Sequence, residues 1–171
     1  MRTPGRCGGR AARIRVFDAR GLKILPDRVV QPFMATAPIA HTRASSPPPG
    51  TAFDSADLAH ALHGASPAFL DALDVGVIAL DNAGKVLAYN TFEQRLAGLC
   101  AGDVIGRDFF VEVAPCTNNF MVRERFVDAW QSKTPLDEVI RYTFTYRMKP
   151  TRVRLRLLVH EQVGWLVVQP E

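Results

Sequence analysis

The last third of the chain contains three consecutive segments with β-strand patterning, and this run constrains the fold more than any other feature. The segments span residues 137–146, 151–160 and 163–168. Turn residues separate them, namely Lys149-Pro150 in the first gap and the residues from Gln162 to Gly164 in the second. We expect them to form the second half of an antiparallel sheet.

The middle segment alternates with unusual regularity. Arg152, Arg154 and Arg156 fall on one side of the strand, and Val153, Leu155 and Leu157 fall on the other. The apolar side should face the core. For the arginine side we favour a solvated surface over a surface for a specific anionic partner.

Upstream segments supply a hairpin and several helices. Residues 75–81 and 85–89 surround the turn Asn82-Ala83-Gly84 and predict two more strands. Residues 54–63 predict a helix with Asp54 as its cap and Gly64 as its stop. Ser66-Pro67 opens a second helical turn that runs to Leu73.

Short helical turns are expected between Asn90 and Val113, where glycines interrupt any longer pattern. A longer helix is expected over 120–130, with Phe120, Phe126 and Trp130 on its buried face. The order of elements indicates an α+β protein with a five-stranded antiparallel sheet. Its flanking helices should pack on one side, which is the arrangement of a PAS domain.

Residues 1–52 differ in composition from the remainder. They are rich in Gly, Arg and Pro and show no sustained periodicity, so they predict a disordered tail. Residues 1–33 are a candidate gene-start artefact, since Met34 offers an internal start. Residues 53–73 are expected to be an N-terminal helical cap, and 74–171 the PAS domain.

Composition excludes several classes of protein. The net charge is +4, but residues 1–43 carry nine Arg or Lys against two Asp. The part expected to fold is therefore mildly acidic, and no nucleic-acid partner is predicted. No apolar run approaches the roughly 18 residues of a membrane span, and no secretory signal is evident. The three cysteines lack metal-ligand spacing, so no metal is expected and a cytoplasmic location is favoured.

Cys116 is the first candidate functional residue. It lies in Val113-Ala114-Pro115-Cys116-Thr117, just before the expected 120–130 helix, whose dipole would favour the thiolate. Such a thiolate could hold an activated carboxylic acid as a thioester. Considered alone, a free cysteine such as Cys116 is more often a small buried apolar residue.

Tyr89 and Glu93 are the second candidate pair. Tyr89 ends a predicted strand, and Glu93 follows four residues later, within reach of the same cavity if the intervening residues are helical. Burial would raise the pKa of the Glu93 carboxyl and keep it protonated as a donor. The alternative is a strand-end phenol in water and a surface carboxylate.

Four motifs together resemble the photoactive yellow protein family of blue-light photoreceptors. They are Val113–Thr117, Tyr89-Asn90-x-x-Glu93, Phe109-Phe110, and the segment Tyr142-Thr143-Phe144-x-Tyr146-x-Met148-x-Pro150-Thr151. The resemblance implies that Cys116 carries 4-hydroxycinnamic acid as a covalent thioester. It also implies that Tyr89 and Glu93 hydrogen-bond the phenolate oxygen, and that Phe109, Phe144, Tyr146 and Met148 line the pocket.

The resemblance implies a photosensory PAS domain without enzyme activity, in which photoisomerisation and proton transfer from Glu93 signal to a downstream protein that the sequence does not identify. Two pocket positions depart from the family pattern, with Ala97 in place of threonine and Leu99 in place of arginine. One alternative is a PAS sensor or interaction module without chromophore. An enzyme with Cys116 as nucleophile is a second alternative, although no Cys-His pair is evident.

Overall fold

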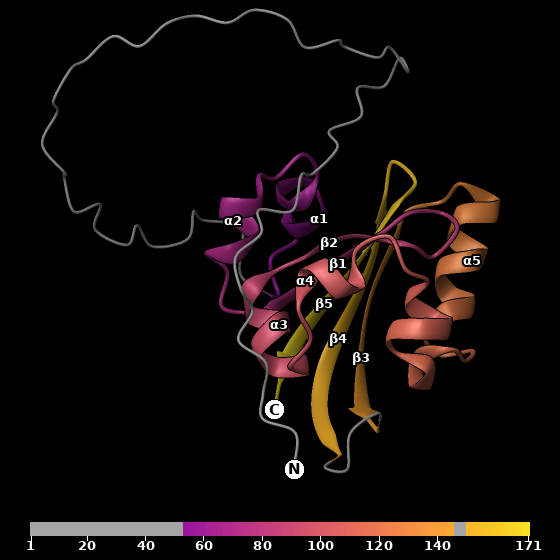
Figure 1. Cartoon of the computed structure of the whole chain (residues 1–171). Coiled ribbons are helices and arrows are strands. Elements are labelled where there is room, and N and C mark those ends of the chain that lie inside the picture. The colour runs from indigo at the N-terminus through magenta and orange to yellow at the C-terminus, as the bar shows by residue number, and fades with distance from the viewer. Residues whose placement is uncertain (1–52, 146–149) are drawn as a thin grey trace, which may run out of the picture. The chain divides into compact units, whose positions relative to one another are not determined.

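The computed structural model describes residues 53–145 and 150–171 (Figure 1). They contain a five-stranded antiparallel sheet with the order β2-β1-β5-β4-β3, which confirms the predicted sheet. The strands are β1 (Gly76–Leu80), β2 (Val86–Tyr89), β3 (Leu136–Phe144), β4 (Thr151–His160) and β5 (Val163–Pro170). The predicted tail, residues 1–52, lies outside the described residues.

The helical segments are short, as the glycine-interrupted pattern predicted. They are α1 (Leu58–Leu62), α2 (Pro67–Asp71), α3 (Thr91–Ala97), α4 (Ala101–Val104), the π-helical turn η1 (Phe109–Val113), the 3-10 turn η2 (Pro115–Thr117) and α5 (Arg123–Ser132). Of the helices in these ranges, none has the length and apolar character that a membrane span requires.

Two predicted helices begin later than expected. The first starts at Leu58, and Asp54 does not cap it but pairs with Arg154. The longer helix starts at Arg123, because Asn119 accepts hydrogen bonds from the backbone of the two residues before Arg123 and closes a turn there. Phe120 is consequently 69% exposed, and its predicted place on the buried face is wrong.

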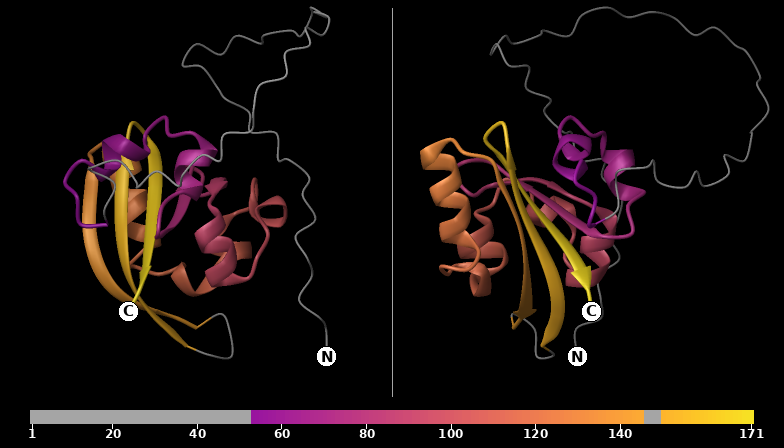
Figure 2. Two further views of the ribbon diagram at one scale, coloured as in Figure 1. Left: turned by 90° about the vertical axis from the view of Figure 1, so that its left-hand side faces the viewer. Right: turned by 180° about the vertical axis from the view of Figure 1, so that it is seen from behind.

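Apolar residues cover both faces of the sheet, so the expectation of helices on one side is wrong. One cluster joins Ile78 and Leu80 of β1 to α3, α4, η1 and α5. The other joins Val77 and Ala79 of the same strand to α1 and α2. Figure 2 shows α5 and the α1–α2 pair on opposite sides of β4 and β5. This two-sided burial explains why β1 is buried at every residue.

A glycine allows α5 to pack closely on the sheet. A Cβ atom at Gly164 would lie 2.7 Å from Cζ2 of Trp130 and 3.1 Å from the ring of Phe126. These two aromatic rings stack with centroids 5.4 Å apart. Gly164 therefore leaves the space in which the α5 aromatic residues meet β5.

The arginine side of β4 is buried at Arg156 and half-buried at Arg154, in contrast to the solvated surface predicted from the sequence. Arg156 is only 5% exposed and donates to both carboxylate oxygens of Asp137 at 2.7 Å. It also donates to the backbone carbonyls of Phe53 (2.6 Å) and Ser55 (2.7 Å). The burial is possible because acceptors satisfy the guanidinium, and only Arg152 at the strand's start is exposed.

We predict that Arg156→Met lowers the free energy of unfolding by roughly 2–4 kcal/mol, because it leaves the carbonyls of Phe53 and Ser55 without their donor. Arg152→Met, on the same side of the same strand, should change it by less than about 0.5 kcal/mol. Urea denaturation of the two variants measures the difference. Equal effects would mean that the contacts of Arg156 do not stabilise the fold.

Candidate functional site

A small pocket lies on the α3–α5 side of the sheet and brings together five of the predicted site residues. Tyr89, Glu93, Leu99, Phe109 and Phe144 line it, with Ile78, Val113 and Ala114 completing the wall. The cavity volume is about 10 Å³, which is room for roughly one water molecule. Apart from Tyr89 and Glu93, the lining side chains are apolar.

Asn90 positions the two polar residues of the pocket. It caps α3 by accepting from the backbone N–H of Glu93 at 3.0 Å, and the same oxygen accepts from Val77 at 2.9 Å. Its amide group donates to the carbonyls of Leu70 (2.8 Å) and Val75 (2.9 Å). Asn90 thus joins the β1 strand, the α2 segment and the start of α3.

Glu93 is the most unusual residue of the pocket. It is 2% exposed, and its Oε2 atom has no hydrogen-bond partner among the described residues. Burial raises the pKa of this carboxyl to about 7, as predicted in direction from the sequence. A Cβ atom at Gly76 would lie 2.1 Å from Oε2, so the glycine provides the space that the carboxyl occupies.

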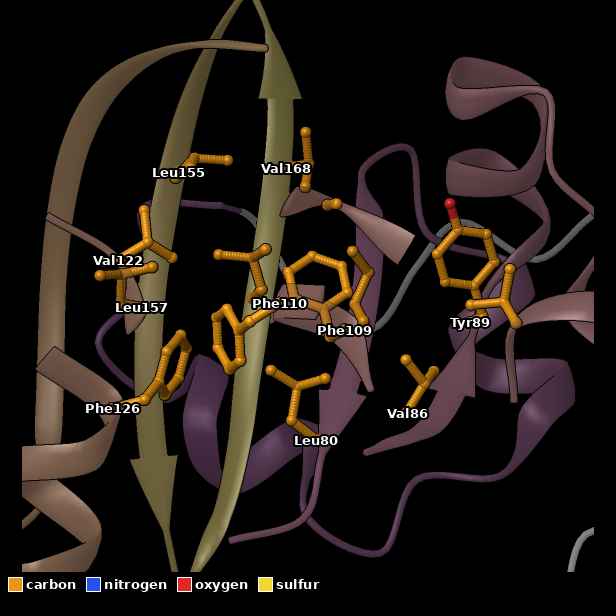
Figure 3. Close-up of a cluster of buried hydrophobic side chains, with 14 of the residues drawn as sticks. Leu80, Val86, Tyr89, Phe109, Phe110, Val122, Phe126, Leu155, Leu157 and Val168 are labelled. Atoms are coloured by element: carbon orange, nitrogen blue, oxygen red, sulfur yellow. The ribbon is translucent and has the colours of Figure 1, made fainter. Parts of the chain in front are cut away.

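Local capping fixes the aromatic wall. Asp108 accepts from the backbone of Phe110 and Val111 at 2.9 Å, which starts the η1 turn, and the N–H of Phe109 donates to Gly84 at 2.9 Å. The rings of Phe109 and Phe110 meet edge to face with centroids 5.3 Å apart. Figure 3 shows Phe126, Phe110, Phe109 and Tyr89 in a row across the core.

Cys116 lies in the η2 turn and is a free, partly buried thiol that packs against the same core cluster. It does not belong to the pocket lining, but the neighbouring Val113 and Ala114 do. The predicted effect of the next helix dipole is wrong, because α5 begins seven residues further on, at Arg123, and the dipole acts only near the first turn.

Sequence reasoning missed two residues that hold the Cys116 backbone. Tyr142 donates to the carbonyl of Cys116 at 2.5 Å, and Asn119 donates to the same oxygen at 2.8 Å. Tyr142 stood in a recognised motif and Asn119 in a polar run after the cysteine. No sequence pattern indicates, however, that side chains 23 residues apart converge on one carbonyl.

The remaining predicted residues have different outcomes. Ala97 is buried in the core cluster but is not a pocket-lining residue, whereas Leu99 is. Tyr146 and Met148 lie outside the described residues. The pocket therefore combines an apolar wall with a phenol and a carboxyl whose pKa is raised by burial.

Comparisons with known proteins agree with this fold. Residues 66–169 match the family described as the PAS fold. Photoactive yellow proteins of Rhodothalassium salexigens and Halochromatium salexigens are 36% and 38% identical to the chain over 105 residues, which is 61% of this chain and 83% of each relative.

A solved structure gives the same result. The photoactive yellow protein domain from the sensor histidine kinase Ppr of Rhodospirillum centenum superimposes with a TM-score of 0.61 and is 38% identical, and the match covers 65% of this chain and 98% of that domain. These relatives indicate a role as a sensor domain. The chain therefore belongs to the PAS fold family and, within it, to the photoactive yellow proteins.

Proposed function

We propose that the protein is a blue-light photoreceptor that carries 4-hydroxycinnamic acid as a thioester on Cys116. The observation that carries this proposal is the buried Glu93 carboxyl, whose Oε2 has no partner among the described residues and which lines an apolar pocket together with Tyr89. A buried polar atom without a partner is costly, and a ligand oxygen in the pocket would remove that cost.

The residues present fit such a pigment chemically. Cys116 offers a free thiol, Tyr89 and Glu93 offer donors for a phenolate oxygen, and Phe109 and Phe144 offer apolar walls for a ring. When bound, 4-hydroxycinnamic acid would supply absorption of blue light and an isomerisable double bond. Because the cavity holds only about 10 Å³, lining side chains must move to admit it.

Glu93 would be the residue that changes charge. In the dark, its protonated carboxyl would donate a hydrogen bond to the ligand oxygen, which agrees with a pKa of about 7 in the pocket. After illumination, Glu93 would give up this proton and become an uncompensated carboxylate in an apolar site. The cost of that charge would drive a conformational change of the surrounding α3 segment.

Leu99 in the pocket wall and Ala97 in the core cluster should both adjust the spectral properties. Leu99 supplies no positive charge to the wall, and Ala97 supplies no hydroxyl to the network around Tyr89. A phenolate is less stabilised without a nearby cation. We expect a shifted absorption maximum, an altered phenol pKa and a changed recovery rate compared with family members that have Arg and Thr there.

A PAS sensor without a covalent pigment is the second candidate function, favoured by the small cavity volume. For an enzyme, by contrast, a base close to Cys116 is required. The rings of His60 and His63 each lie against that of His160, where α1 meets the end of β4 on the other side of the sheet. They therefore give no support to a Cys-His nucleophile, and we propose a sensor without enzyme activity.

The wider organisation is also proposed. We infer a cytoplasmic protein in which residues 1–52 form a tail, 53–73 a helical cap and 74–171 the photosensory domain. Its output would pass to a downstream signalling protein, as expected of a domain related to one from a sensor histidine kinase. Nucleic acid and membrane are not proposed as partners.

We predict that Cys116→Ala acquires no colour when the purified chain is incubated with an activated ester of 4-hydroxycinnamic acid, because the thiol that would form the thioester is removed. Asn118→Ala, which changes an exposed neighbour and keeps Cys116, should load normally. Absorption spectra and mass spectrometry after denaturation measure bound pigment. A yellow Cys116→Ala protein that stays yellow after denaturation would contradict the proposed anchor.

We predict that Glu93→Gln still binds pigment but has a red-shifted band and a smaller light-induced structural change, because an amide cannot donate a proton and leave a carboxylate. The difference in far-UV circular dichroism between light and dark measures the change. Wild-type amplitude in the variant would remove proton transfer from the mechanism.

Without pigment, the free energy of unfolding should fall as the pH rises from about 4.5 to about 7, because folding holds the Glu93 carboxyl in its neutral form. The full loss should be roughly 3 kcal/mol. Subtracting the profile of Glu93→Gln removes the contributions of all other titrating groups. Parallel profiles would show that Glu93 does not titrate in this range.

A further inference from the structure

Three polar groups form a closed hydrogen-bonded triangle at the peptide of Cys116. The Tyr142 hydroxyl donates to the Cys116 carbonyl oxygen at 2.5 Å, and the Asn119 amide donates to the same oxygen at 2.8 Å. The third side joins the Asn119 amide to the Tyr142 oxygen at 2.8 Å. We call Asn119 and Tyr142 the carbonyl clamp.

The orientation of the Asn119 amide is determined by its partners. Its nitrogen has two hydrogens, and the two acceptors of the triangle use both. Its oxygen accepts from the backbone N–H groups of Met121 (2.9 Å) and Val122 (3.2 Å). A flipped amide would set its hydrogens against these two donors, so only one orientation satisfies all four contacts.

Tyr142 is likewise suited to donate. Its ring packs edge to face on Phe144, with centroids 5.7 Å apart, and Phe144 lines the pocket. Burial raises the pKa of the Tyr142 hydroxyl, although the hydrogen bond from Asn119 opposes this shift. The hydroxyl therefore keeps its proton at neutral pH, and this proton is available to the Cys116 carbonyl.

The backbone on either side of Cys116 is held as well. Pro115 restricts the residue before it, and the side chain of Thr117, which is fully buried, donates to the Ala114 carbonyl at 2.7 Å. With both flanking peptides restrained, the thiol retains mainly rotation about its own Cα–Cβ bond. The direction of the sulfur is thus determined by the clamp and the η2 turn.

We propose that Asn119 and Tyr142 are positioning residues for the Cys116 thiol, which they orient for acylation by an activated aromatic carboxylic acid. This inference rests on the function proposed above. In the reaction, the thiolate attacks the acyl carbon, the sulfur–carbon bond forms, and the leaving group of the activated acid departs with its electron pair. The thiol proton goes to solvent.

The test compares Tyr142→Phe, which keeps the ring on Phe144 and loses only the hydroxyl, and Asn119→Ala with the wild-type chain. Thr143→Val and Asn118→Ala are matched controls, since both residues are exposed neighbours of the clamp. The measured quantity is the rate of acylation by an activated ester of 4-hydroxycinnamic acid. Labelling of the thiol by iodoacetamide, a small reagent with little orientational demand, is measured in parallel.

We expect each clamp variant to be acylated at least about tenfold more slowly, since small misplacements of reacting groups cost large factors in rate. Iodoacetamide labelling should change less than acylation, and both controls should behave as wild type. Infrared spectra of protein labelled with ¹³C at the cysteine carbonyls should show one band at higher wavenumber in both variants, because this carbonyl has lost a donor.

The outcomes separate this inference from the proposed function. If the wild type is acylated and both clamp variants react at the same rate, the positioning role is overturned and the photoreceptor proposal remains. If the wild type is not acylated at all, both fall. Circular dichroism and urea midpoints identify a clamp variant that fails to fold, and the other clamp variant then decides. In a folded clamp variant, an equal loss of acylation and of iodoacetamide labelling would also overturn the positioning role.

Discussion

The buried side chain of Asn90 uses all of its hydrogen-bonding capacity to join segments on which the pocket depends. Its oxygen accepts from Val77 and Glu93, and its amide donates to Leu70 and Val75. The residue before it, Tyr89, ends β2, and Glu93 lies in the first turn of α3. Because Asn90 determines where the strand becomes a helix, it also determines that a phenol and a carboxyl line one cavity.

The carboxyl placed in this way is costly to the fold. Glu93 is buried, Oε2 lacks a partner among the described residues, and burial raises the pKa of the carboxyl. Gly76 accommodates the carboxyl by having no side chain. Buried ionisable groups with a strongly shifted pKa are typical of functional sites.

Elsewhere, the same sheet shows how buried charge is stabilised when partners are present. Arg156 is almost as buried as Glu93, yet each of its donors that faces the protein meets an oxygen of Asp137, Phe53 or Ser55. These contacts attach the start of the described chain to β4 on the face opposite the pocket. Arg156 is therefore a buried ionisable residue with a structural role, whereas Glu93 is a buried ionisable residue with a candidate functional role.

Local sequence was sufficient to predict the five strands, the short helical turns and the pairing of Tyr89 with Glu93, because strand alternation and turn or cap residues act over a few neighbours. The exposure of Phe120 and the distance of Cys116 from α5 follow from the local turn that Asn119 closes before Arg123. Tertiary structure alone decided the burial of Arg156. It alone brought Asn119 and Tyr142 to the Cys116 carbonyl. Both outcomes depend on segments that are distant in the chain and meet in space. The periodicity within one segment does not indicate which distant segment will supply a hydrogen-bond acceptor or donor, or which will shield a side chain from solvent.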